Sequence, residues 1–113
     1  MTERITVTID FRACRYISEL YRELRTKLDW EDDYGESLDA LWDILWGMPH
    51  KGDDFTIVRP LYFQNIPGGQ GQRFTEYVDK ICNVFRRAEQ QGFVRLKIEY
   101  SNAPIHDLSD YLL

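Results

Sequence analysis

The sequence has few of the residues that mark several common classes of protein. It contains two cysteines, Cys14 and Cys82, and neither belongs to a Cys-x-x-Cys pair. A zinc or redox motif is therefore not supported, and two reduced, partly buried thiols are expected. No apolar run approaches the roughly 18 residues that span a bilayer, and the polar start from Met1 to Arg4 is unlike a signal peptide. We expect a cytoplasmic protein without a membrane segment.

Motifs for metals, cofactors and nucleic acids are also scarce. His50 and His106 have no second His or Cys at ligand spacing, and residues 68–71 lack the Lys and Ser/Thr that complete a P-loop. We expect no metal and no cofactor. Basic residues are scattered except for Arg86 and Arg87, so direct binding of nucleic acid is not expected.

Lys and Arg are missing from one long stretch, between Leu28 and His50. The same stretch carries seven acids: Asp29, Glu31, Asp32, Asp33, Glu36, Asp39 and Asp43. The net charge of the whole chain is −5, so the remainder is slightly basic and the protein is acidic because of this one patch. A local patch of one sign indicates a basic partner or site.

The composition is that of one compact domain. The chain has 113 residues, of which 43% are hydrophobic, and it carries three Trp, seven Tyr and six Phe. A disordered chain lacks the apolar area that offsets the entropy of ordering. We assign residues 1–100 to a single domain and residues 101–113 to a C-terminal tail with three apolar residues that could dock back.

Hydrophobic periodicity predicts alternating strands and helices. Strands are predicted at residues 4–9, 55–58 and 93–100, and helices at residues 16–28, at the nine residues between Ser37 and Gly47, and from residue 74 to Gly92. Residues 61–66 suggest one helical turn, and residues 67–71 a loop. Strands separated by helices imply right-handed crossovers. The predicted fold class is therefore α/β, a small single domain with a three-stranded parallel sheet covered by helices.

The short helix after Ser37 has an apolar face and an acidic face. Its apolar positions are Leu38, Leu41, Trp42 and Leu45, and Glu36, Asp39 and Asp43 cluster away from them. Asp43 follows Asp39 by one turn and lies near the C-terminal end of the helix. Both the like-charge pair and the helix dipole disfavour it there. Stability alone would not select Asp43.

Aromatic residues are interspersed with these acids. Trp30 and Tyr34 precede the helix, Trp42 borders its apolar face, and Trp46 borders its acidic face. Aromatic side chains among charges suit an interface, although each of them singly suits a core position better, Trp42 above all. An enzyme is not expected, because an acid/base pair needs a cleft and two different environments, which an exposed helix face does not indicate.

The run Asp33-Tyr34-Gly35-Glu36-Ser37-Leu38-Asp39-Ala40-Leu41-Trp42-Asp43-Ile44-Leu45, followed by Gly47, resembles the signature segment of the barstar family. Members of that family are intracellular inhibitors of the ribonuclease barnase. The Tyr-Gly-Glu and Leu-Asp-Ala-Leu-Trp-Asp patterns carry the resemblance. A looser similarity extends from Ile5 to Tyr100, and the order of predicted elements agrees with a barstar-like fold.

The resemblance implies a site and a function. In the family, this helix and the preceding loop plug the active site of a basic ribonuclease, and an inhibitor carboxylate takes the place of a substrate phosphate. Asp43 matches that carboxylate. The partner-binding residues expected here are Asp33, Tyr34, Ser37, Leu38, Asp39, Trp42, Asp43, Trp46, Gly47 and Met48. The predicted function is that of a ribonuclease inhibitor or toxin immunity protein.

Three departures from the family pattern bear on the partner. Asp33 and Met48 replace aromatic residues of the family's interface, and Arg87 replaces a contacting Glu. The expected partner is therefore a basic ribonuclease or a related toxin with a rearranged site, bound by a chain that is a monomer when free. The alternative is an acidic adaptor or nucleic-acid mimic that inhibits nothing.

Overall fold

The computed structural model describes residues 6–28, 30, 35–47, 53–64 and 66–101. The elements within them are β1 Thr6–Asp10, α1 Ile17–Leu28, α2 Leu38–Trp46, β2 Asp53–Arg59, the 3-10 helix η2 Pro67–Gly69, α3 Gly71–Gln90 and β3 Val94–Tyr100. The predicted alternation of strands and α-helices is confirmed. The first two residues of the strand predicted at 4–9, and residues 102–113 of the predicted tail, lie outside the described residues.

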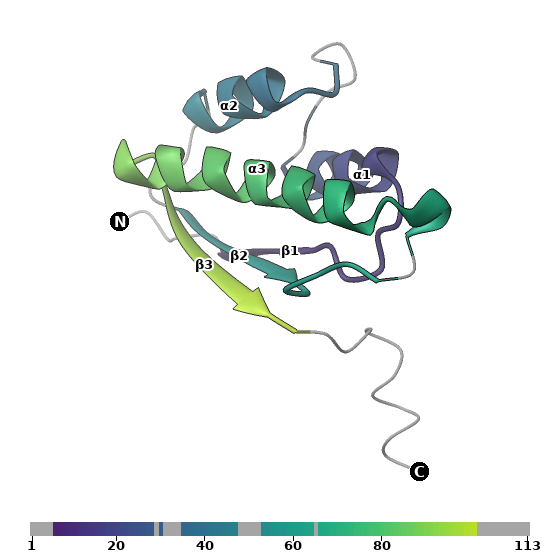
Figure 1. Ribbon diagram of the computed structural model, residues 1–113. Coiled ribbons are helices and arrows are strands. Elements are labelled where there is room, and N and C mark those ends of the chain that lie inside the picture. Colours follow the sequence, from purple (N-terminus) through teal and green to yellow (C-terminus); the bar gives the residue numbers. More distant parts are fainter. Residues whose placement is uncertain (1–5, 29, 31–34, 48–52, 65, 102–113) are drawn as a thin grey trace.

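The strands form one parallel sheet in the order β1-β2-β3. Ile9 pairs with Ile57, and Ile57 pairs with Ile98, so one line of apolar residues crosses the sheet. Because the strand order follows the chain order and parallel crossovers are right-handed, every crossover lies over the same face. Figure 1 shows α1, α2 and α3 on one side of the sheet. The α/β fold with a parallel sheet covered by helices is confirmed.

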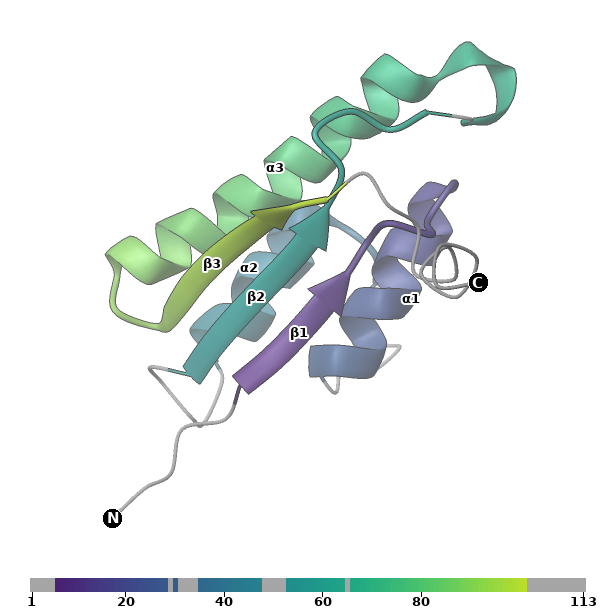
Figure 2. The same ribbon diagram turned by 90° about the horizontal axis from the view of Figure 1, so that it is seen from below.

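The core lies between the covered face of the sheet and the helices. Alternate strand residues and helix residues three or four apart contribute to it. The largest fully buried apolar side chains are Phe11, Tyr21, Phe55, Phe85, Ile9, Leu20, Leu24, Leu41, Leu45, Ile57 and Ile81. Figure 2, turned by 90° so that the sheet lies in front of α2, shows α1 along β1 and α3 along β3. Helix α2 packs mainly on α3, and this placement leaves its other face outside the core.

Both cysteines contribute to this core as free thiols, as the sequence predicted. Burial raises the pKa of Cys14 to about 12, because the thiolate would lose its hydration. Burial also raises the pKa of Cys82, although Arg59 opposes the shift. Neither thiol is therefore activated as a nucleophile.

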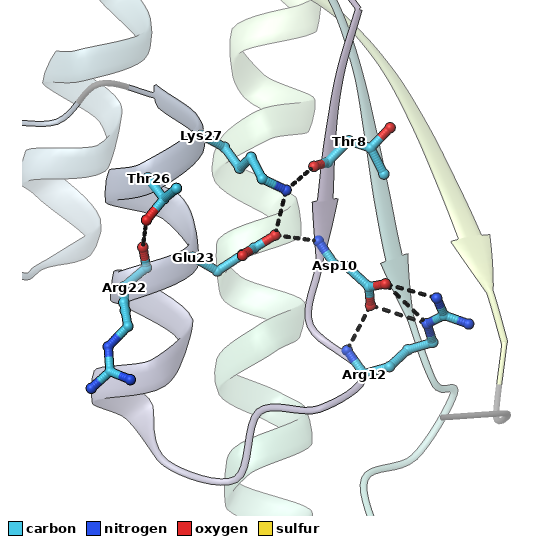
Figure 3. A network of polar contacts seen from close by, with 7 residues as sticks. All are labelled: Thr8, Asp10, Arg12, Arg22, Glu23, Thr26 and Lys27. Carbon is cyan, nitrogen blue, oxygen red and sulfur yellow. Dashed lines mark hydrogen bonds and ion pairs between the residues drawn. The ribbon is translucent and has the colours of Figure 1, made fainter. Parts of the chain in front are cut away.

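Side chains of α1 cover the outer edge of the sheet at β1 (Figure 3). Glu23 accepts a hydrogen bond from the backbone N–H of Asp10 at 2.9 Å, and the ammonium group of Lys27 donates to the carbonyl of Thr8 at 2.7 Å. Lys27 and Glu23 also form an ion pair at 2.9 Å. These bonds occupy backbone groups on the side of β1 that faces away from β2. An edge strand with occupied groups is a poorer template for pairing with another chain.

The opposite edge, at β3, is covered in the same way from α3. The carboxylate of Glu89 accepts a hydrogen bond from the backbone N–H of Leu96 at 3.0 Å. Polar side chains at 95, 97 and 99 alternate with more buried residues along this strand, so one of its faces is exposed to solvent. A carboxylate from a crossover helix therefore contacts each edge of the sheet.

The segment after β2 differs from the prediction. We expected one helical turn within residues 61–66, but the residues described there are not helical, and the turn occurs at Pro67–Gly69 in the expected loop. Hydrogen bonds from Arg59 and to α3 account for this difference. The guanidinium of Arg59 donates to two backbone carbonyls just after the strand, and the N–H of Phe63 donates to the hydroxyl of Thr75 at 3.0 Å. These bonds hold the segment in an irregular path against α3.

Candidate protein-binding site

Helix α2 has well-defined ends. Ser37 adopts an extended backbone conformation, and its hydroxyl accepts a hydrogen bond from the N–H of Ala40 at 3.0 Å. At the other end, the N–H of Gly47 donates to the carbonyl of Asp43 at 3.0 Å. An N-cap side chain satisfies one of the free N–H groups of the first turn. The predicted start at Ser37 and stop at Gly47 are confirmed.

The packing of α2 determines which residues point outward. Leu41 and Leu45 are fully buried, and Ala40 is nearly so. Leu38, Trp42 and Ile44 are partly buried against the same core. Because side chains on opposite sides of a helix cannot both face the core, Asp39 and Asp43 are exposed.

The carboxylates of Asp39 and Asp43 have no hydrogen bond or ion pair with any residue that the structure describes. The last turn of α2 also contains no basic residue. Two like charges one turn apart, with no ion pair to a described residue, are mildly unfavourable in the free protein. Both groups are available to accept hydrogen bonds from another molecule.

Glu36 has a different role from these two acids. Its carboxylate forms an ion pair with Arg25 of α1 at 2.8 Å, and both side chains are about one-third exposed. This ion pair links the start of α2 to α1. Glu36 therefore stabilises the fold, whereas Asp39 and Asp43 are exposed and form no ion pair with a described residue. Sequence periodicity grouped Glu36 with Asp39 and Asp43 and did not reveal this difference.

An aromatic ridge lies beside the acidic face. The ring of Phe93 lies 5.9 Å from that of Trp42 and 6.2 Å from that of Trp46, measured between centroids. Trp46 is 58% exposed, whereas Trp42 is partly buried. Arg87 of α3 stacks on Trp42, with its guanidinium carbon 5.0 Å from the centre of that ring. We define Arg87, Trp42, Phe93 and Trp46 as the Arg–aromatic ridge.

The structure places seven of the ten predicted site residues on or at the ends of α2: Ser37, Leu38, Asp39, Trp42, Asp43, Trp46 and Gly47. Asp33, Tyr34 and Met48 lie outside the described residues. Trp30, which precedes the helix, is 5% exposed and packs edge-on against Tyr21 at 5.7 Å, so it belongs to the core. Phe93 was not predicted as part of the site, because its sequence position indicated only the start of a strand.

Other kinds of site find little support in the geometry. Within the ranges described, no three His, Cys, Asp or Glu side chains gather closely enough to hold a metal ion. None of the described helices combines the length and the apolar character needed to cross a membrane. The described residues do include an exposed acidic face on α2 with aromatic side chains beside it.

Comparison with known proteins identifies the family. Residues 4–101 match the Barstar family, described as barnase inhibitors, and the chain belongs to that family. It is also similar to a protein of Bacillus subtilis (strain 168) named "Putative ribonuclease inhibitor YrdF". The two are 49% identical over 86 residues, which cover 75% of this chain and 86% of the relative. The suspected resemblance to the barstar family is confirmed.

Proposed function

We propose that this chain inhibits a basic ribonuclease, or a related toxin, by placing the exposed face of α2 in its active site. The observation that carries the proposal is the pair of exposed carboxylates of Asp39 and Asp43, which have no partner among the described residues although the helix that holds them is capped and packed. Membership of the Barstar family supports a ribonuclease as the partner.

The chemistry of a phosphate site suits this arrangement. Such a site holds Arg, Lys or His donors, and a carboxylate can accept charge-assisted and often bidentate hydrogen bonds from them. In the proposal, Asp43 occupies the position of a substrate phosphate and Asp39 contacts a neighbouring cation. Because buried leucines fix the backbone of α2, binding needs to order only the side chains of the two aspartates.

The remaining predicted residues complete the proposed interface. Trp46 supplies exposed apolar area beside Asp43, and aromatic side chains of this kind often anchor protein interfaces. Ser37, Leu38, Trp42 and Gly47 border the acidic face from the two ends and the buried side of α2. Asp33, Tyr34 and Met48 are proposed on the sequence pattern alone.

The proposed biological role is that of an immunity protein, or antitoxin, which acts in the cytoplasm and is a monomer when free. A cell that produces a ribonuclease needs such an inhibitor wherever its own RNA is exposed. The chain itself would catalyse no reaction.

A panel of purified basic ribonucleases tests the proposal. Each enzyme is titrated with the chain while RNA cleavage is followed, and the same mixtures are examined for complex formation. Stoichiometric inhibition of at least one enzyme is expected. Binding without inhibition would indicate an acidic adaptor instead, and cleavage of RNA by the chain alone would indicate an enzyme, so either result contradicts the proposal.

A further inference from the structure

Arg87 occupies an unusual position for a basic residue. It lies in the last turn of α3, is exposed, and stacks on the ring of Trp42 in α2. No carboxylate among the described residues forms an ion pair with it, whereas Arg12, Arg25 and Arg59 each have one. The stacking interaction holds the guanidinium beside α2, while its charge is not neutralised by a neighbouring acid.

The guanidinium lies against a residue of α2 that neighbours both acids along the helix. Trp42, on which it stacks, directly precedes Asp43 and lies three residues after Asp39. Figure 1 shows that the C-terminal ends of α2 and α3 lie at the same end of the molecule. The Arg–aromatic ridge therefore lies along the helix that carries the acids, so a partner bound to Asp43 and Trp46 would come close to Arg87.

The helix dipole accounts for only part of this arrangement. A basic residue in the last turn of a helix is favourable, and Arg87 satisfies that preference for α3. The last turn of α2 has the same need, yet it contains Asp43 and no basic residue. Arg87 thus carries a charge that stabilises its own helix, whereas Asp43 carries a charge that does not. The two charges are opposite in sign and lie near the C-terminal ends of packed helices.

We infer that Arg87 determines which ribonuclease this chain binds: it disfavours an enzyme whose active site is surrounded only by cations and favours one with a carboxylate beside its basic site. The inference rests on the proposed function. Like charges brought together in an interface are costly, and such repulsion is a common means of rejecting the wrong partner. Opposite Arg87, a carboxylate would form a charge-assisted, bidentate pair with a guanidinium already oriented by Trp42.

Three variants test the inference. Arg87→Glu reverses the charge, Arg87→Gln removes it, and Arg73→Glu makes the same reversal on an exposed residue near the other end of α3. At a rise of 1.5 Å per residue, the control lies about 21 Å away along the helix. Circular dichroism and thermal unfolding establish that each variant is folded before its dissociation constant is measured.

Barnase serves as the probe for an enzyme with a strongly basic site. Arg87→Glu should bind barnase at least about tenfold more tightly than the unchanged chain, and Arg87→Gln should show a smaller gain. Arg73→Glu should change the affinity by less than about twofold, because salt screens charges separated by more than about 10 Å. An equal gain from both reversals, or no binding of barnase by Arg87→Glu, would overturn the inference.

The ribonuclease that the unchanged chain inhibits most strongly provides the opposite test. Arg87→Glu should weaken that complex by at least about tenfold, since an attractive contact becomes a repulsive one. A gain in affinity would overturn the inference. Adding Asp43→Ala to each chain separates the two proposals. If Asp43→Ala leaves binding intact, the proposed function fails; if only the Arg87 effects are missing, the inference fails alone.

Discussion

Glu23 and the backbone N–H of Asp10 form a 2.9 Å hydrogen bond that covers the free edge of β1, as Glu89 does for Leu96 on β3. The double variant Glu23→Ala, Glu89→Ala should expose both edges. We expect it to be less stable by about 1–2 kcal/mol and to associate at concentrations where the unchanged chain does not. Light scattering over a concentration series measures the association.

Glu76→Ala is a control for that experiment, because Glu76 is exposed on α3 and its carboxylate accepts a hydrogen bond from Gln72 of the same helix. It removes a carboxylate without opening an edge. If the double variant and the control associate equally, the edge contacts do not limit pairing.

The stability of the fold should depend on pH through Asp10. Burial raises the pKa of this carboxyl, but hydrogen bonds from the guanidinium and backbone N–H of Arg12 outweigh burial and lower it below 3.8. The charged form is therefore favoured in the folded state. Its contribution to stability is present above pH 3.8, the ordinary pKa of the group, and is lost as the pH falls through the lower pKa of the folded state. Asp10→Asn should destabilise the protein by about 1 kcal/mol at pH 7.

Urea unfolding of the unchanged chain and of Asp10→Asn, repeated from pH 7 downward, measures this contribution. The difference in unfolding free energy between the two proteins should shrink below pH 3.8. A difference that stays constant over the whole range would show that the charge of Asp10 does not contribute.

Much of the fold could be predicted from the sequence because it depends on local patterns. Ser37 and Gly47 fixed the ends of α2, and apolar spacing identified the buried face with Leu41 and Leu45. The parallel sheet followed from the alternation of strands and helices. These signals lie within a few residues of one another, so no knowledge of distant contacts was needed.

The features that could not be predicted depend on residues far apart in the chain. Arg59 is 2% exposed and pairs with Asp79 of α3, and its guanidinium carbon lies 6.0 Å from the centre of the Phe63 ring and 5.5 Å from that of the Tyr100 ring. An arginine at the end of an apolar strand gives no sign of such burial in the sequence. The same limit applies to Phe93, whose contact with Trp46 joins the end of α2 to the turn before β3.

Association with the target should depend on salt. The exposed acids of α2 create a negative field that attracts a basic enzyme, and salt shortens the reach of that field. We expect the association rate to fall by about tenfold between roughly 50 and 500 mM NaCl, and the double variant Asp39→Asn, Asp43→Asn to show a weaker dependence. Stopped-flow fluorescence of the exposed Trp46 provides the signal. An association rate that does not change with salt would argue against electrostatic steering.

The most direct test of the proposed function compares Asp43→Ala with Asp54→Ala. Asp54 precedes Phe55 in β2, and because Phe55 points into the core, Asp54 lies on the sheet face away from α2. Both variants lose one negative charge. The measurement is the dissociation constant for the ribonuclease that the unchanged chain inhibits most strongly. Asp43→Ala should weaken binding by at least about 100-fold and Asp54→Ala by less than about threefold, whereas equal losses would contradict the role of Asp43 as a phosphate mimic.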